Sequence, residues 1–391
     1  MTGIGVGVST LKNPSRAGKE AACRALDMVT DPSRCCLVFA TAGYPQRSLL
    51  DAIRDQVGPI PMAGCSGEGI IGPGVADESN HAVLVAAIAD PRISFKTAGY
   101  PTVSNSRAAA RHVGISLSRH VTEQARFALL FPGGLHVVAD EFLTELEAHL
   151  PPDLPCLGGA AGENWQRQTT YQYHDWQIYD EGVSAALVSG DFRLATSVSH
   201  GCVPIGTELE ISRVEGNRLY ELGGRPVMDV MAEYVGEDIW SDFGKVAVHF
   251  CLGQALKSDL ADAYDPLIIR FIPQCHPEDK SVSLPVRMTK GERVWMTRRD
   301  HRKMFESAKN SIDGLRDELR GAIPFLALHF DCAGRGKVVL SEADKLELIA
   351  SFQKGWGQGT PWAGFFTYGE FCPIAGRNMF HNYTAAIALL Y

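Results

Sequence analysis

The stretch 35–67, CCLVFATAGYPQRSLLDAIRDQVGPIPMAGCSG, decides the fold class. It begins with a short apolar run that ends at Gly43, which is typical of a buried strand. Apolar residues then recur at helical spacing between 48 and 57, and the run IPMAGC at 60–65 predicts a second strand. A strand, a helix and a strand in succession are typical of α/β proteins.

The same alternation continues along the chain. Before residue 170 it predicts strands at 81–90 and 126–134 and helices at 106–120 and 139–150. From 171 to 220 the pattern changes to alternating, glycine-punctuated strands, and a helix follows at 225–236. We therefore expect an α/β fold of two domains, 1–222 and 223–391, with mixed β-sheets and flanking helices.

The second half repeats features of the first. It is expected to contain a strand at 281–289 and a long helix at 301–319. Gly67-Glu68 follows a predicted strand in the first half, and Gly369-Glu370 follows one in the second. This echo predicts a pseudo-duplication of the two halves.

Composition excludes several classes of protein. The chain has 391 residues, of which 45% are hydrophobic, so it is long enough for more than one domain with a real core. Its formal charge of −8 and the absence of a basic block argue against a nucleic-acid partner. No apolar run is long enough to span or insert into a membrane, and no signal peptide is evident, so we expect a cytoplasmic protein whose ten cysteines are reduced.

A glycine-rich segment at 64–74, GCSGEGIIGPG, matches the spacing G-x-G-x-x-G of a dinucleotide-binding loop. The polar sequence that follows, VADESNH, does not open an amphipathic helix, so the match is interpreted as accidental. Cys65, Ser66, Gly67 and Glu68 nevertheless place small polar groups on a backbone that a ligand can approach closely. We expect these four residues to contribute to a ligand pocket.

The C-terminal segments hold the other candidate ligand residues. Arg335 lies in the small-residue turn that follows Cys332, and its guanidinium is suited to grip a carboxylate or a phosphate. With Glu370 it predicts a bipolar pocket for a zwitterion such as an amino acid; the alternative is that the two side chains pair with each other or with solvent. Asn382 lies in a compact polar cluster that serves either a ligand or nearby backbone groups.

The case for catalysis is weak. The segment G-C-S-G-E at 64–68 does not meet the nucleophile-elbow pattern G-x-S-x-G. His329 and Cys332 are three positions apart, so on a strand they face opposite sides. We expect a protein that is not an enzyme, and the alternative is an enzyme with a reactive Cys332.

The cysteines and histidines do not show the spacing of a zinc site. His200-x-Cys202 and Cys275-His276 are the closest approaches to one. A single histidine in apolar surroundings is, however, sufficient as the proximal ligand of a haem.

Six segments in order resemble one family: CLGGAAGENW, SHGCVPIG, LYELGGRPVMDVMAEYVG, DCAGRG, GFFTYGEF and HNYT. Together with GCSGEGIIG, they resemble the FIST (F-box and intracellular signal transduction) sensory proteins, with both the N-terminal and the C-terminal FIST domains present. The resemblance runs from about residue 35 to the end, and its specificity lies in the ordered set.

The resemblance implies a sensor of the stand-alone bacterial type. Such proteins bind small ligands, amino acids among them, and signal through separate partners such as a histidine kinase, a cyclic-dinucleotide enzyme or a chemotaxis component. In this interpretation the glycine-rich segment is part of a ligand-pocket wall. Some stand-alone members of similar size bind haem and sense nitric oxide, and His200 is then the candidate haem ligand here.

Overall fold

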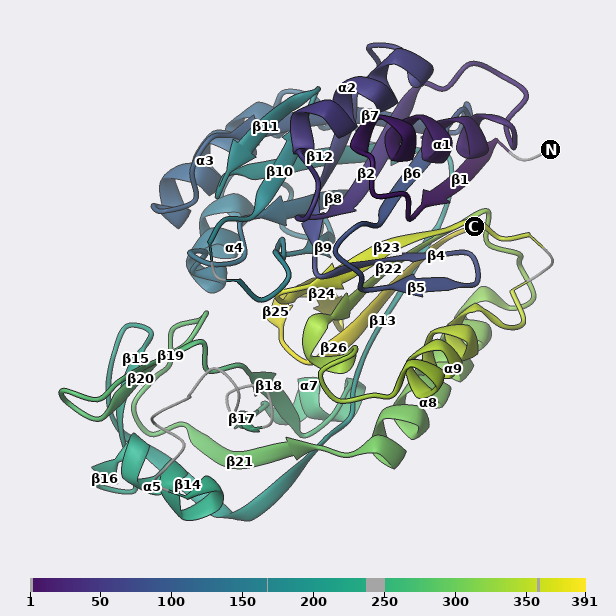
Figure 1. The fold of residues 1–391 in the computed structure, drawn as a ribbon. Coiled ribbons are helices and arrows are strands. Elements are labelled where there is room, and N and C mark those ends of the chain that lie inside the picture. The colour runs from purple at the N-terminus through teal and green to yellow at the C-terminus, as the bar shows by residue number, and fades with distance from the viewer. Residues whose placement is uncertain (1–2, 167, 237–249, 357–358) are drawn as a thin grey trace.

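A computed structural model describes residues 3–166, 168–236, 250–356 and 359–391 (Figure 1). The chain forms a mixed α/β fold with three six-stranded sheets and one eight-stranded sheet, and helices flank the sheets. The predicted fold class is therefore confirmed.

Three of the sheets are built from copies of one unit, in which the order is strand, helix, strand, helix, strand, hairpin, strand. In the first unit the elements are β1 (Ile4–Ser9), α1 (Pro14–Leu26), β2 (Cys35–Thr41), α2 (Gln46–Val57), β3 (Met62–Gly67), β4 (Gly69–Gly72), β5 (Val75–Asp77) and β6 (Val83–Ile88). In the second they are β7 (Ile93–Tyr100), α3 (Ser106–Ser118), β8 (Ala125–Pro132), α4 (Ala139–Glu147), β9 (Cys156–Gly159), β10 (Tyr171–His174), β11 (Gln177–Asp180) and β12 (Val183–Gly190).

The third unit has the same order but is interrupted after its first strand. Its elements are β13 (Leu194–His200), α8 (His301–Leu319), β22 (Leu326–Cys332), α9 (Glu342–Gln353), β23 (Trp362–Thr367), β24 (Glu370–Ile374), β25 (Arg377–His381) and β26 (Thr384–Leu390). A short 3-10 turn, Ala333–Arg335, follows β22. In every unit the last strand pairs antiparallel with both the first and the second strand, and the third strand is parallel to the second.

The units are joined by exchange of their hairpins. The hairpin of the first unit pairs with β23 of the third, that of the second pairs with β3 of the first, and that of the third pairs with β9 of the second. Each six-stranded sheet therefore contains four strands of one unit and two of another. This cyclic exchange closes the three units into a ring.

Three phenylalanines from equivalent positions meet where the units join. Phe39, Phe131 and Phe330 each lie on the second strand of their unit, one residue after the position that pairs with Gly64, Gly158 or Gly364. Their ring centroids are 5.4 to 6.5 Å apart, mostly edge to face. Since aromatic pairs favour these distances, the three rings form a common core for the ring of units.

A separate region of the chain, residues 202–299, is inserted between β13 and α8. Its elements are β14 (Cys202–Glu215), β15 (Arg218–Leu222), β16 (Arg225–Pro226), α5 (Val227–Val235), β17 (Phe250–Ala255), α7 (Ser258–Ala263), β18 (Leu267–Arg270), β19 (Gln274–His276), β20 (Ser281–Ser283) and β21 (Arg293–Arg299). The long strands β14 and β21 pair and carry this inserted region away from α8 (Figure 1). The domain boundary expected after residue 222 lies inside it, between β15 and β16.

The structure bears on three expectations from the sequence. Gly67 ends β3 and residues 69–72 form β4, so a strand and not a helix follows the glycine-rich segment, as its polar continuation predicted. The strand expected at 281–289 is limited to Ser281–Ser283. The echo between Gly67-Glu68 and Gly369-Glu370 has a third member, Gly162-Glu163, which follows the equivalent strand of the second unit.

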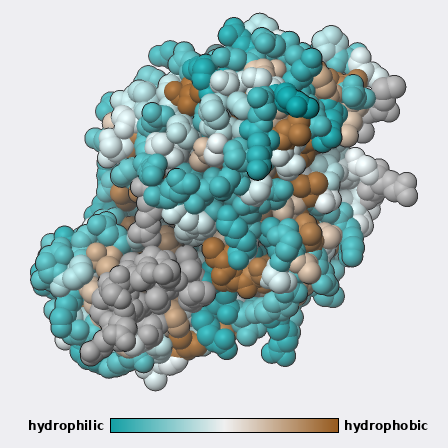
Figure 2. Space-filling model, in the orientation of Figure 1, coloured by the Kyte–Doolittle hydropathy of each residue, from teal (hydrophilic) through white to brown (hydrophobic). Residues whose placement is uncertain are grey.

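The face of the molecule in Figure 2 is mainly hydrophilic, with scattered hydrophobic areas. Few large hydrophobic side chains are exposed among the described residues, and they lie far apart in the sequence: Met28, Ile115, Ile323 and Leu346. None of the described helices combines the length and the apolar character needed to cross a bilayer.

Candidate functional site

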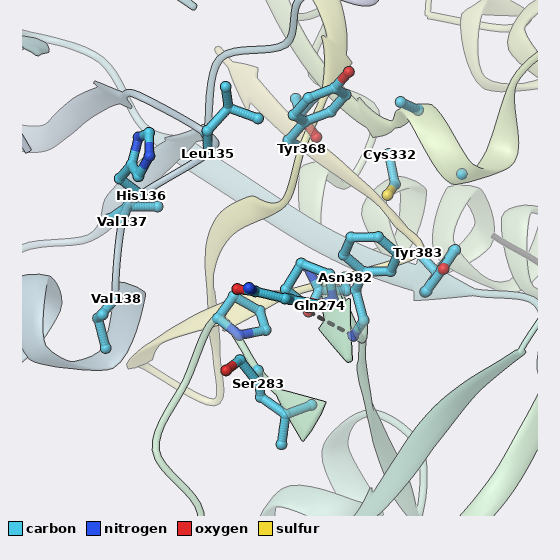
Figure 3. Close-up of a pocket in the computed structure, with 18 of the residues that line it drawn as sticks. Leu135, His136, Val137, Val138, Gln274, Ser283, Cys332, Tyr368, Asn382 and Tyr383 are labelled. Carbon is cyan, nitrogen blue, oxygen red and sulfur yellow. Dashed lines mark hydrogen bonds between the residues drawn. The ribbon is translucent and has the colours of Figure 1, made fainter. Parts of the chain in front are cut away.

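A cavity of about 460 Å³ lies between the units and the inserted region. The second unit contributes the loop 134–138, which follows β8, and Trp165. The third unit contributes the turns that follow β22, β23 and β25. The inserted region contributes residues that flank β19 and β20, so segments distant in sequence surround one space (Figure 3).

The walls of the cavity are uncharged. Aromatic side chains are prominent in the lining: Trp165, Phe271, Tyr368 and Tyr383. Amide and hydroxyl groups come from Asn217, Gln274, Ser283, Thr367 and Asn382. All lining residues belong to the described part of the chain, and none of them is Asp, Glu, Lys or Arg. A cavity with this lining suits a neutral, partly aromatic ligand held by a few directional hydrogen bonds.

Hydrogen bonds donated by backbone amides connect the inserted region to the units beside this cavity. The amide of Phe271 donates to Asn382 Oδ1 at 3.0 Å. The amide of Ala139, at the start of α4, donates to the carbonyl of Pro285 at 2.8 Å. The cavity is therefore bounded by the contact through which the inserted region is held against the second and third units.

Two of the predicted ligand residues, Cys332 and Asn382, line the cavity. Burial raises the pKa of the Cys332 thiol well above its ordinary value, and the neighbouring Glu370 adds to the effect. A thiol in this state is largely protonated near neutral pH and is a poor nucleophile. Burial and the raised pKa therefore do not favour a reactive Cys332.

Arg335 and Glu370 are both buried, but neither lines the cavity. Arg335 Nε donates to Asp331 Oδ1 at 2.7 Å. Glu370 Oε2 accepts from Thr384 Oγ1 at 2.6 Å, and burial raises the pKa of this carboxyl to about 8. Each of the two side chains is thus engaged with its own neighbour, and no ion pair joins them among the described residues.

The glycine-rich segment connects two units. Cys65, Ser66 and Gly67 are buried in β3. The hydroxyl of Ser66 donates to the carbonyl of Gly162 at 2.7 Å and accepts from the amide of Tyr171 at 2.9 Å. These contacts join the first unit to the second, and none of the three residues lines the cavity.

Glu68 lies directly behind the cavity wall. Its Oε2 accepts from the hydroxyl of Tyr368 at 3.1 Å, and its Oε1 is 2.9 Å from Nζ of Lys337. Burial outweighs the attraction of Lys337 and raises the pKa of Glu68 to about 7. Tyr368 itself lines the cavity, so Glu68 is one side chain removed from a ligand.

His200 is buried outside this cavity, beside a groove along β13 and α8. Its Nδ1 accepts from the amide of Cys202 at 3.0 Å, and its Nε2 is 3.2 Å from Asp265 Oδ1. A histidine that ligates haem iron must offer one nitrogen with a free lone pair. Nδ1 of His200 is thus engaged by the Cys202 amide, whereas Nε2 lies close to the carboxylate of Asp265 but forms no hydrogen bond with the described residues, so His200 stays a candidate haem ligand outside this cavity.

Sequence reasoning missed Trp165, Tyr368 and His136, which line the cavity. The rings of Trp165 and Tyr368 are in contact, with centroids 5.2 Å apart and planes tilted by 41°, and each residue lies within two positions of a Gly-Glu dipeptide, which was the available signal. His136 Nδ1 is 3.1 Å from Glu181 Oε2, a contact that orients the imidazole ring and leaves Nε2 for a ligand.

No group of three His, Cys, Asp or Glu side chains is placed to hold a metal ion within the described ranges.

Comparisons with known proteins agree with this architecture at the level of the family. The FIST N domain model matches residues 34–225 and the FIST C domain model matches residues 228–373. The uncharacterized protein Rv0628c of Mycobacterium tuberculosis (strain H37Rv) is 27% identical over 99% of both chains. The uncharacterized protein Mb0898c of Mycobacterium bovis is 28% identical over 99% of this chain and 98% of its own. Among solved structures, a cyanuric acid hydrolase from A. caulinodans aligns over 99% of this chain and 98% of its own, with 10% identity and a TM-score of 0.40.

Proposed function

This chain belongs to the FIST family, and on that premise we propose that it is a non-catalytic sensor that binds a small neutral molecule in the cavity. The observation that carries this proposal is the position of the cavity, which is bounded by the contact between the inserted region and the units. A ligand there touches both parts and stabilises the arrangement it fits, which is the requirement for a shift between two conformations. A separate protein, such as a histidine kinase or a cyclic-dinucleotide enzyme, then receives the signal, and we place both in the cytoplasm.

The lining decides the class of ligand that we propose. A free amino acid carries an ammonium and a carboxylate, and both need partners when they are taken out of water. The cavity walls offer no charged side chain to either group. A neutral aromatic or heteroaromatic compound with one or two polar substituents is the better match for Trp165, Tyr368 and the amide of Asn382.

A thermal-shift screen of neutral aromatic compounds against amino acids tests this proposal. We expect hits among the aromatic compounds, with a rise in Tm that grows with ligand concentration. Leu135→Trp fills the cavity, because Leu135 lies in its wall (Figure 3), and should abolish the shift. Ile323→Trp adds the same ring at an exposed site, 70% accessible, and should leave the shift unchanged. Equal shifts in Leu135→Trp and the unaltered protein would rule out this cavity.

A haem-based nitric oxide sensor is the second candidate, and one observation favours it. His136 lines the cavity with its Nδ1 held by Glu181, the arrangement that a carboxylate gives to histidines that ligate a metal. Trp165, Phe271 and Tyr383 supply the aromatic walls that such a group requires. When bound, haem would supply the iron that binds the gas.

An absorption spectrum before and after addition of haem separates the two candidates. On the haem proposal a Soret band appears and is lost in His136→Ala, and it persists in His200→Ala because His200 does not line the cavity. A spectrum that stays that of free haem, or a band that depends on His200 instead, would contradict the assignment to His136.

A further inference from the structure

The hairpin formed by β19 and β20 presents a polar face at the cavity. Gln274 pairs directly with Ser283 across the two strands. Side chains alternate along a strand, so His276 shares the face of Gln274 and Ser283, and Val282 points the other way. Val282 is fully buried in the core shared with the second unit. The hairpin is thus anchored by the face of Val282, and its other face carries Gln274, His276 and Ser283 together with the buried Ser281.

At this face a serine and a histidine are in hydrogen-bond contact, and a glutamate from the following turn lies nearby. Ser283 Oγ lies 2.8 Å from His276 Nε2, and His276 Nδ1 lies 3.6 Å from Oε1 of Glu278, an exposed side chain that also pairs with Arg218. A carboxylate near Nδ1 favours the tautomer that carries its proton there, which leaves the lone pair of Nε2 to accept the serine proton. This is the order of nucleophile, base and orienting acid that activates a serine hydroxyl.

A neighbouring serine shows that the arrangement is specific to Ser283. Ser281 pairs with His276 and lies on the same face as Ser283, but it is fully buried, and its hydroxyl donates to Asp279 Oδ1 at 2.7 Å. It also accepts from Arg218 Nε at 2.7 Å. Ser283 instead lies in the cavity wall, where a ligand can reach it (Figure 3).

Gln274 supplies the remaining element of such a site. It lines the cavity beside Ser283, and directly opposed residues on paired strands have Cβ atoms about 5 Å apart. Its amide N–H groups are therefore in reach of an oxygen that becomes negative when Ser283 attacks a carbonyl carbon.

We propose that Ser283 is a nucleophile that takes up the acyl group of a neutral carboxylic ester bound in the cavity. In this step a bond forms between Ser283 Oγ and the acyl carbon, and the bond from that carbon to the leaving alcohol breaks. The proton of Oγ passes to His276 Nε2 and then to the departing alkoxide, and Gln274 donates to the carbonyl oxygen. The inference rests on the cavity proposed above as the ligand site. In this sensor the acyl group of an electrophilic ligand becomes covalently bound to Ser283.

Labelling with a fluorophosphonate tests this directly, because the probe forms a stable bond from Oγ to phosphorus with loss of fluoride. We expect stoichiometric labelling of the full-length protein, none in Ser283→Ala, and unchanged labelling in Ser281→Ala, the matched control. His276→Gln should slow the reaction about a hundredfold, the usual contribution of a general base. Glu278→Gln should lower the midpoint of the pH–rate profile, because Glu278 acts only through His276.

Three results would overturn the proposal: no labelling of the unaltered protein, labelling that survives Ser283→Ala, or labelling lost in Ser281→Ala. Leu135→Trp should block the probe together with neutral ligands. If thermal shifts occur in the unaltered protein without any labelling, the nucleophile is refuted and the sensory cavity still stands. If labelling occurs without thermal shifts for any neutral compound, the nucleophile stands and the sensory role of the cavity is refuted.

Discussion

A single phenolic oxygen connects the cavity to a pair of buried carboxyl groups. Tyr368 Oη lies 3.1 Å from Glu68 Oε2 and 3.2 Å from Glu163 Oε1, and it accepts from the amide of Trp165 at 3.0 Å. A phenol donates one hydrogen bond and accepts two, so its single proton is shared between the two carboxylates that face it. Tyr368 therefore links the cavity to Glu68, whose pKa is raised to about 7 by burial.

Glu68 should make the fluorescence of Trp165 depend on pH. The charged groups around Glu68 are Lys337 and Glu78, and Lys345 reaches Glu78 from α9. Because burial raises the pKa of Glu68 to about 7, its carboxyl is protonated below neutral pH and ionised above it. We expect a change in tryptophan emission centred near pH 7, which Trp165→Phe removes. Glu68→Gln, which does not titrate, should also remove the change; an unaltered transition in that variant would contradict the assignment to Glu68.

Glu370 should make the whole protein less stable as the pH rises. Its carboxyl is fully buried and its pKa is raised to about 8 by desolvation, so the folded state keeps a proton that the unfolded state has released. Stability from this group is complete below about pH 4.5 and is lost as the pH rises toward 8, with a slope of about 1.4 kcal/mol per pH unit. Glu370→Gln should flatten that slope in urea unfolding between pH 5 and 8. An identical slope in the variant would show that other groups cause it.

At the scale of elements, the sequence predicts much of the fold from local pattern. The helix expected at 301–319 matches α8, where Asp300 caps the first turn by accepting from the amide of Lys303. The strands of 35–67 also lie where the apolar runs place them. The strand expected at 281–289 ends earlier, at Ser283. Leu284 and Val286 are apolar because they are buried, not because they belong to a strand, so the apolar pattern predicted a strand that is too long.

The threefold repeat was missed for a physical reason. The sequence features that the units share are short. One is a glycine at the same position of the third strand, and another is a Gly-Glu dipeptide in the turn after that strand. The Gly-Glu dipeptide after the third strand was noticed in two units but not at Gly162-Glu163. In the third unit, about a hundred inserted residues also separate the first strand from its helix. The cavity depends on loops from several such elements, so only Cys332 and Asn382 of its lining could be named from the sequence.

The glycine at the shared strand position should be indispensable. A Cβ built on Gly364 would lie 1.8 Å from the carbonyl oxygen of His329 on the paired strand, and Gly64 meets Val38 in the same way. Both obstacles are backbone atoms in the middle of a sheet, so they have little freedom to move. We expect Gly364→Ala to lower the free energy of unfolding by about 3 kcal/mol or more. The control is Gly314→Ala, a helical site with no heavy atom near the new Cβ, which should stabilise by up to about 1 kcal/mol.

At the scale of the whole molecule, the chain enters and leaves the inserted region at one place on the ring. Cys202 pairs with Arg299 across β14 and β21, and the amide of Asp300 donates to the carbonyl of Gly201 at 2.7 Å. The chain therefore leaves the third unit and returns to it at neighbouring positions. The units need no residue of the insertion to complete their own sheets, because every strand of the three six-stranded sheets comes from the units.

A chain in which an Asn-Gly turn replaces residues 203–298 should therefore keep the ring of three units. The two-residue turn suits strands that are already paired in register at Cys202 and Arg299. We expect native-like circular dichroism and cooperative thermal unfolding, at a lower Tm because the second unit shares a hydrophobic core with the insertion. Ligand-induced shifts should vanish with the removed cavity wall. Loss of cooperative unfolding would instead mean that the insertion and the ring fold as one unit, and that a ligand between them acts on stability more than on their relative position.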